Sequence, residues 1–193
     1  MDLNGKKIIL GSNSPRRREL LKGLDVEFVI DTKTNFVESI PPDALHESVP
    51  VLMAEGKSLG FHRPLGDDEV LITADTMVLC GKDILGKPHS KEEAAEMLRL
   101  LSGKEHKVIT AVTLRDSRQF RTFTDTARVF FKELTESEID YYLNRYKPYD
   151  KAGSYGVQEW IGYIGIERID GSYFNVMGFP TSKVYKELSE FVL

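Results

Sequence analysis

The chain opens with a strand, a helix and a second strand, and this order restricts its fold more than any other feature. Residues 8–10 form a short apolar run that predicts a buried strand. The polar loop after this run leads to Pro15, a residue favoured at the first position of a helix, with Ser14 as the N-cap. The predicted helix starts at Pro15, runs through residues 16–21 and stops near Gly23, and the apolar run at residues 28–30 predicts the next strand. This β-α-β order predicts an α/β protein.

The rest of the chain continues to mix helices and strands. Capping boxes at residues 90–93 and 135–138 predict two helices, the first followed by apolar residues at helical spacing and the second ending before Pro148. Alternating stretches at residues 108–115 and 120–131 predict an antiparallel hairpin. Further expected elements are a loop over 35–50, a helix over 51–60, two apolar runs over 70–79 interrupted by a polar triplet, a strand over 163–169 and a final helix from residue 180.

The length and the charge of the chain limit its organisation and its partners. A chain of 193 residues without a linker is expected to form one domain. Its 26 Lys and Arg residues against 30 Asp and Glu residues give a net charge of −4, so no global positive field attracts nucleic acid or an anionic membrane. Nucleic acid and membrane are therefore not expected partners. The single Cys80 and an N-terminal segment without a long apolar stretch favour a cytoplasmic protein.

Histidine and cysteine do not form a metal-binding pattern in this sequence. The four histidines lack metal-ligand spacing, and each is expected at the surface: His46, His62, His89 and His106. Cys80 lies in an apolar run and is expected in the core. The phosphate-binding P-loop, the zinc-protease helix and the serine-hydrolase elbow are also missing. Several large enzyme classes therefore lose their support.

The remaining candidates for a site are polar residues in loops that follow strands. Residues 12–17 combine hydroxyls, helix N–H groups and guanidinium groups, which suit a phosphate, although a capped helix with a solvated basic face explains them equally well. Asp75 interrupts an apolar strand and needs compensation from a metal, a lysine, an activated water or backbone N–H groups. Lys57 and Lys87 are weak signals alone. Residues 150–158 combine charges, an amide and glycines that permit close approach of a ligand.

In their order along the chain, these segments resemble the Maf family of nucleoside triphosphate pyrophosphatases. The resemblance rests on residues 10–21, 38, 54–57, 74–76, 86–88, 150–158 and 171–180. It implies a mixed twisted sheet with flanking helices, two lobes around a cleft and a fold similar to that of inosine triphosphate pyrophosphatases, in a single bilobed domain over residues 1–193. It also implies hydrolysis of a nucleoside triphosphate to the monophosphate and diphosphate, with Mg²⁺ or Mn²⁺ as the cofactor.

The resemblance assigns roles to individual residues. Asp75 matches the proton acceptor of the family, and Asp75 and Glu38 are expected to hold the metal ion. The residues that match the phosphate and metal site are Ser12, Arg17, Glu38, Lys57, Lys87 and Lys151. Three further residues match the positions that separate subgroups, and they have the pattern of the subgroup acting on dTTP and UTP: Arg16, Thr76 and Gln158. A glutamine amide has a donor and an acceptor, which suit the carbonyl and N–H edge of uracil or thymine.

The chain also departs from the common pattern of the family at two places. Glu159 and Trp160 follow Gln158 where a glycine is more usual, and Ser154 stands where alanine is frequent. These changes concern the expected base pocket more than the phosphate chemistry.

Two functions follow from the resemblance. The first is a house-cleaning hydrolase that acts on dTTP, UTP or modified pyrimidine nucleotides. The second is a nucleotide-binding regulator of cell division with little turnover, because the family was first associated with septum formation. The intact Asp75 and lysines favour the enzyme, and turnover of dTTP with Mg²⁺ discriminates the two. A homodimer is a further expectation.

Overall fold

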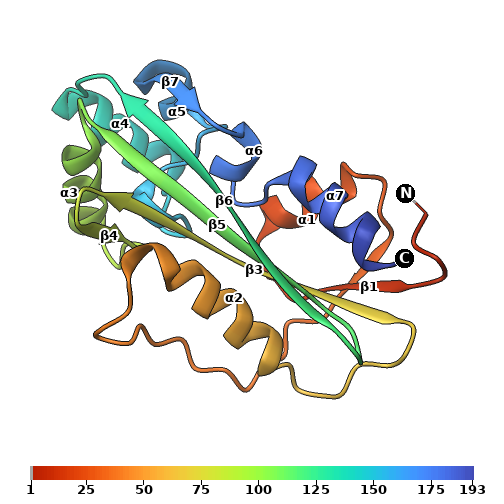
Figure 1. The fold of residues 1–193 in the computed structure, drawn as a ribbon. Helices are drawn as coiled ribbons and strands as arrows, with labels where there is room; N and C mark the ends of the chain where they lie inside the picture. The colour runs from red at the N-terminus through yellow and green to blue at the C-terminus, as the bar shows by residue number, and fades with distance from the viewer. Residues whose placement is uncertain (1) are drawn as a thin grey trace. The chain divides into compact units, whose positions relative to one another are not determined.

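A computed structural model describes residues 2–193 as a mixed α/β protein (Figure 1). One seven-stranded sheet has the order β2-β1-β3-β5-β6-β7, and β4 pairs with β3 beside this path. The strands are β1 (Lys7–Leu10), β2 (Phe28–Ile30), β3 (Glu69–Cys80), β4 (Asp83–Leu85), β5 (Glu105–Arg115), β6 (Phe120–Phe131) and β7 (Ile166–Asp170). The sheet is mixed, because β1 pairs in parallel with β2 and β3, whereas β3 with β4 and β6 with β7 are antiparallel.

Seven α-helices and two short 3₁₀ turns complete this description. The helices are α1 (Pro15–Lys22), α2 (Val49–Leu59), α3 (Lys91–Leu101), α4 (Glu136–Tyr146), α5 (Trp160–Gly165), α6 (Tyr173–Val176) and α7 (Thr181–Phe191), and the 3₁₀ turns are His46–Ser48 and Ala152–Ser154. The predicted α/β class with a mixed sheet and flanking helices is confirmed. Within residues 2–193, no helix combines the length and the apolar character that a membrane span requires.

The chain forms two compact units, and strands β3, β5 and β6 pass through both. The first unit contains the chain up to Asp75 together with Thr110–Asp125 and Gly178–Leu193. The second unit contains Thr76–Ile109 and Thr126–Met177.

The first unit is built on β1, β2 and the first half of β3. Leu10 lies beside Ile72 in the parallel register, and both side chains are buried. Figure 1 shows α2 on one side of these strands and α1 and α7 on the other. Ile9 and Leu71 pack in a buried cluster with Phe61, which follows α2. Helices on both faces explain why residues 8–10 of β1 and 70–72 of β3 are all apolar and buried, whereas Val29 and Ile30 of the edge strand β2 are exposed.

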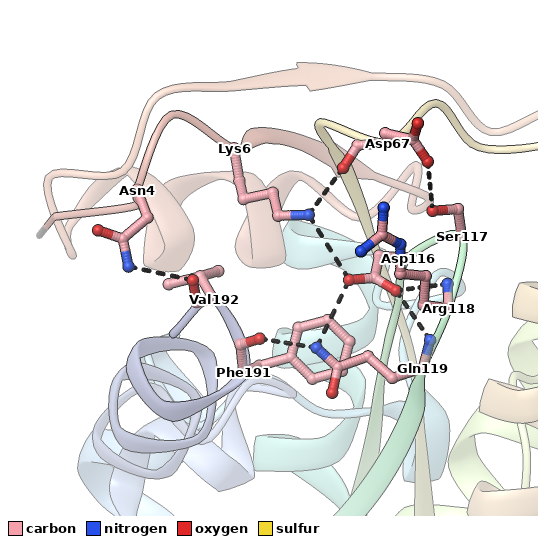
Figure 2. Close-up of polar contacts among 9 residues, drawn as sticks. All are labelled: Asn4, Lys6, Asp67, Asp116, Ser117, Arg118, Gln119, Phe191 and Val192. Atoms are coloured by element: carbon pink, nitrogen blue, oxygen red, sulfur yellow. Dashed lines mark hydrogen bonds and ion pairs between the residues drawn. The ribbon is translucent and has the colours of Figure 1, made fainter.

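A polar cluster joins the N-terminal segment, the turn between β5 and β6, and the end of α7 (Figure 2). The Asp116 carboxylate accepts backbone N–H bonds from Arg118 and Gln119, both at 2.8 Å, and Lys6 lies 3.7 Å away. Burial would raise the pKa of Asp116, but these hydrogen bonds and Lys6 outweigh it, so the pKa is lowered. The Gln119 amide donates to the Phe191 carbonyl at 2.9 Å. The predicted hairpin turn is thereby held in place.

The second unit has a core between α3, α4 and the second half of β3. Leu98, Leu101 and Ile139 are buried there, as the apolar spacing of the two helices predicts. The predicted capping box of α4 is confirmed. The predicted capping box of α3 is only half correct. Ser90 caps the helix, but the Glu93 carboxylate accepts from the backbone N–H of His89 and not from the backbone N–H of Ser90.

Several predicted elements differ in the structure. Helix α2 begins at Val49, two residues early, because Pro50 occupies its first turn. The two apolar runs over 70–79 are one continuous strand, β3. The strand predicted over 163–169 is present but begins later, at Ile166, because residues 160–165 form α5.

The expected surface position of one histidine is also wrong. His106 is buried, and its ring packs against Phe131 and Tyr155 with centroid distances of 5.4 Å. Burial lowers the pKa of His106 to about 4, so the ring is neutral at neutral pH. Cys80 is buried as predicted, and burial raises the pKa of its thiol.

Candidate active site

Asp75 lies on the face of β3 that is covered by α2. Side chains alternate along a strand, so Thr73 and Asp75 point to the same face. The Thr73 hydroxyl donates to the Ala54 carbonyl of α2 at 2.7 Å, and one helical turn later the Lys57 Nζ lies 2.6 Å from the Asp75 Oδ1. The side chains of Lys57 and Asp75 are 19% and 20% exposed. The sequence left open whether a metal, a lysine, an activated water or backbone N–H groups compensate the Asp75 charge. In the structure a lysine, Lys57, does so.

Glu38 completes a group of three charges around Lys57. Its Oε1 lies 3.0 Å from the Lys57 Nζ, although the Glu38 side chain is 61% exposed. The segment that carries Glu38 is held on α2 by Phe36, whose ring occupies the place where a Cβ of Gly56 would be. The Asn35 backbone N–H also donates to the Gly60 carbonyl at 2.7 Å. Helix α2 therefore positions both Lys57 and the loop that presents Glu38.

The start of α1 gathers hydroxyls and a guanidinium, as its sequence predicts. The Ser14 side chain caps the helix by accepting from the Arg17 backbone N–H. The Arg17 guanidinium donates to the Ala74 and Gly178 carbonyls, both at 2.9 Å, and to the Ser12 hydroxyl at 3.3 Å. Burial lowers the pKa of Arg17, and the nearby Asp75 acts in the opposite direction. Arg17 therefore ties three segments of the first unit together beside the residue that precedes Asp75.

The second unit holds the predicted lysine Lys151 in a buried polar network. Its Nζ lies 2.8 Å from Asp150 and 3.0 Å from the Glu159 Oε1. The Glu159 Oε2 accepts a short hydrogen bond from the Tyr142 hydroxyl, which accepts from the Gly156 backbone N–H at 3.0 Å. Burial and then the bond to Glu159 raise the pKa of Tyr142, so its hydroxyl keeps its proton and donates.

Gln158 is the base-reading residue that the resemblance predicts. Its Oε1 is buried and accepts no hydrogen bond from any residue of the described chain. A buried acceptor without a partner is costly, and it is satisfied when a ligand brings a donor. The side chain therefore has the unused acceptor that recognition of a base N–H requires.

The other predicted residues are less constrained. Lys87 is exposed in the turn before α3, and the preceding Gly86 carbonyl accepts from the Gly153 backbone N–H at 3.1 Å. Arg16 and Thr76 are half-buried, on α1 and β3 respectively. Thr76 follows Asp75 directly and begins the second unit.

The carboxylates of this site suit a hard divalent cation. Mg²⁺ is commonly held by one or two carboxylates together with phosphate oxygens of the substrate. Asp75 and Glu38 supply two such carboxylates on one lysine, and among residues 2–193 there is no group of three or more His, Cys, Asp or Glu side chains that would enclose a metal. The donor set therefore fits a cation that arrives with the nucleotide better than a permanently enclosed ion.

Sequence reasoning alone missed the residues that position this site. Thr73, Phe36, Tyr142 and Glu159 hold other site residues through contacts that are distant along the chain. The only local signal is the pair Gly56 and Gly60 in and after α2, since a Cβ at either position would meet Phe36 at close range.

An open cavity of about 420 Å³ lies elsewhere in the first unit. Its lining residues are Glu55, Leu59, Arg115, Asp116, Arg118, Gln119 and Phe120, none of which is a predicted site residue. Two of its charged side chains are already engaged, because Arg115 donates to the Ser58 carbonyl at 2.6 Å and Asp116 accepts backbone N–H bonds. The cavity therefore adds no chemistry to the candidate site.

Nearly the whole of this chain is similar to known proteins. A family model described as Maf-like protein matches residues 7–191. A dTTP/UTP pyrophosphatase of Porphyromonas gingivalis is 48% identical over 98% of this chain and 96% of that protein. Proteins of the same name from Bacteroides fragilis and Flavobacterium johnsoniae are 49% and 42% identical, and the matches cover 98% and 96% of this chain and 98% and 95% of those proteins.

A solved structure titled as a HAM1 protein from Coxiella burnetii matches 96% of this chain and 99% of that chain, with a TM-score of 0.47 and 11% identity. The match of a family model to residues 7–191, together with relatives at 42% to 49% identity, shows that this chain belongs to the Maf-like protein family.

Proposed function

We propose that this chain is a nucleoside triphosphate pyrophosphatase that hydrolyses dTTP and UTP to the monophosphate and diphosphate. The observation that carries the proposal is 48% identity over 98% of the chain to a protein named dTTP/UTP pyrophosphatase, with the expected acidic and basic residues all present. The Lys57–Asp75–Glu38 group supports the same function.

The charges of the first unit support binding of a metal-loaded triphosphate. Lys57 pairs with both Asp75 and Glu38, and the Arg17 guanidinium adds a second positive charge that acts on the same two carboxylates. The two carboxylates would repel the triphosphate, whereas a divalent cation between them and the phosphate oxygens offsets this repulsion. When bound, Mg²⁺ or Mn²⁺ would supply charge neutralisation and polarisation of phosphate oxygens, and Asp75 and Glu38 are the residues that would hold it.

Asp75 is the residue that we assign as the proton acceptor for the attacking water. Lys57 donates to its Oδ1 at 2.6 Å, which fixes the carboxylate and leaves the second oxygen to accept from water. Arg17, anchored by the Ala74 and Gly178 carbonyls, adds positive charge next to this carboxylate. Lys87 and Lys151 are the lysines of the second unit that we assign to phosphate oxygens.

Gln158 is the residue that we assign to the base. Its buried Oε1 would accept from the N3–H of uracil or thymine, and its amide N–H would donate to a neighbouring carbonyl. Adenine and cytosine have no ring N–H next to a carbonyl on this edge, which supports a preference for dTTP and UTP over the triphosphates of those two bases.

The proposal is tested with the purified chain and the common nucleoside triphosphates, with and without Mg²⁺ or Mn²⁺. We expect diphosphate and monophosphate as products, with dTTP and UTP hydrolysed fastest. Activity should vanish with EDTA and return with either ion, because hard oxygen ligands suit both. Full activity after exhaustive chelation would refute the metal requirement, and a preference for a purine triphosphate would refute the substrate assignment.

A further inference from the structure

Glu159 lies just before α5 and contacts Lys151 directly and the Gly156 backbone through Tyr142. One carboxylate oxygen, Oε1, lies 3.0 Å from the Lys151 Nζ. The other, Oε2, accepts from the Tyr142 hydroxyl, and this hydroxyl accepts from the Gly156 backbone N–H at 3.0 Å. A single side chain therefore links Lys151 with the backbone two residues before Gln158.

The packing around Glu159 is as specific as its hydrogen bonds. A Cβ at Gly156 would lie 2.8 Å from the Glu159 Cδ, so the absence of a side chain at Gly156 is what leaves space for the carboxylate. Lys151 is 8% exposed and Tyr142 is 0% exposed. Polar contacts in such surroundings are directional, and their loss leaves buried partners unsatisfied.

We propose that Glu159 is a positioning residue that fixes Lys151 and Gln158 relative to each other, so that they meet the phosphates and the base of one pyrimidine nucleotide. This inference rests on the proposed function, which assigns Lys151 to phosphate and Gln158 to the base.

Asp150 provides a matched control for the charge on Lys151. Its Oδ1 lies 2.8 Å from the same Nζ, but its side chain is 56% exposed, and the Tyr142 hydroxyl donates to Glu159. Glu159→Ala and Asp150→Ala therefore remove the same charge from Lys151, and only the first removes the link to Gly156.

The first experiment compares the kinetics of these two variants on dTTP, UTP and a purine triphosphate. Glu159→Ala should lower kcat/KM for dTTP and UTP by about 10-fold or more and narrow the preference for pyrimidines, because both ends of the nucleotide lose a fixed contact. Asp150→Ala should keep the preference of the wild type. Glu159→Gln should restore most of the preference, because its amide oxygen can still accept from Tyr142.

The second experiment replaces a single hydroxyl and tests the link without removing a charge. Tyr142→Phe should raise KM for dTTP and UTP, and the effect should be smaller in the Glu159→Ala background because the two residues act through each other. Tyr155→Phe is the control, since the Tyr155 hydroxyl is also buried but bonds to the His106 ring at 2.7 Å. This pair keeps the inference testable if Glu159→Ala does not fold.

A third measurement needs no nucleotide and separates the inference from the proposed function. Hydrogen exchange of the Gly156 amide should accelerate in Glu159→Ala and remain slow in Asp150→Ala. If the wild type does not hydrolyse dTTP or UTP, the proposed function fails, and the exchange rates still test the link. Wild-type kinetics or unchanged Gly156 exchange in Glu159→Ala, or equal effects of the two tyrosine variants, would overturn the inference.

Discussion

Asp75 lies inside an apolar strand, and the ion pair with Lys57 offsets the cost of placing a carboxylate there. Without a partner, a buried charge costs several kcal/mol, on the order of what separates folded from unfolded protein. The lysine comes from α2, 18 residues earlier in the chain. At the scale of single residues, the site therefore depends on a contact that no local sequence pattern encodes.

Asp75→Asn should abolish hydrolysis of dTTP and leave the chain folded. The amide keeps the shape of the side chain but cannot accept a proton from water, a loss of about 100-fold or more in kcat. Lys57 keeps Glu38 as an ionic partner, so the melting temperature should change little. The measurements are diphosphate release and thermal unfolding of the same purified protein.

Asp68→Asn is the matched control for this variant. Asp68 also pairs with a lysine, Lys7, at 2.7 Å, but it precedes β3 and lies far along the strand from Asp75. Its replacement should leave kcat unchanged. A folded Asp75→Asn protein that retains most of its kcat would remove Asp75 from the role of base.

A second prediction at this scale separates recognition of the base from phosphate chemistry. Gln158→Ala should lower kcat/KM for dTTP and UTP by about 10-fold to 100-fold, the cost of a polar contact whose partners are left unpaired. Lys87→Ala should lower turnover of all triphosphates by a similar factor and keep their order. Rates for the common triphosphates with both variants test this, and an untouched pyrimidine preference in Gln158→Ala would contradict it.

At the scale of elements, α2 organises the first unit's part of the site. Its two neighbouring turns carry Ala54, which accepts from Thr73, and Lys57, which binds Asp75. Its glycine at position 56 receives the Phe36 ring, which holds the loop with Glu38. Helix α2 therefore positions the Lys57 ammonium group and also the loop that brings the Glu38 carboxylate close to it.

Gly56→Ala tests this role of α2. Alanine favours a helix over glycine by about 1 kcal/mol, but here its Cβ would overlap the Phe36 ring and displace the loop that carries Glu38. We expect the Mg²⁺ concentration for half-maximal activity to rise several-fold. In a Phe36→Ala background the same substitution should have little further effect, because the steric conflict is gone. Equal effects in both backgrounds would show that the ring does not transmit the change.

The elements that sequence patterns predicted are those that local interactions decide. Helix α4 has a capping box, formed by Thr135 and Glu138, that closes within four residues. The boundary between α5 and β7 was mispredicted because the apolar run there fits a helix and a strand equally well. Packing decided it, since Ile161 is buried in the core of the second unit and Ile164 packs against that core.

The candidate site could be predicted only in part for the same reason. The sequence singled out Asp75 because a carboxylate in an apolar run needs a partner, and it left the partner open. The family resemblance nominated Lys57, and the fold brings the two together. Tyr142 gave no signal, because a tyrosine on a helix has an ordinary explanation. Glu159 stood out only as a departure from the family pattern, and its contact with Tyr142, 17 residues earlier in the chain, could not be predicted.

At the scale of the whole molecule, two buried or partly buried groups lower the free energy of unfolding in acid, each over a different range of pH. Glu69 is hydrogen-bonded by Arg63 and by the Gly66 backbone N–H, and these bonds lower its pKa to about 2. Its contribution to stability is present above its ordinary pKa of 4.5 and is lost as the pH falls towards 2. His106 acts at higher pH, because burial lowers its pKa from 6.5 to about 4.

The histidine therefore predicts a loss of stability in mild acid. Between pH 6.5 and 4 the unfolded chain binds a proton that the folded chain excludes from the His106 ring, so the free energy of unfolding should fall by about 3 kcal/mol over this range. Urea unfolding at several pH values measures this slope, the change in the free energy of unfolding with pH. His106→Phe should remove most of it, whereas His46→Asn, which replaces an exposed histidine, should keep it. An unchanged slope in His106→Phe would assign the acid sensitivity to other groups.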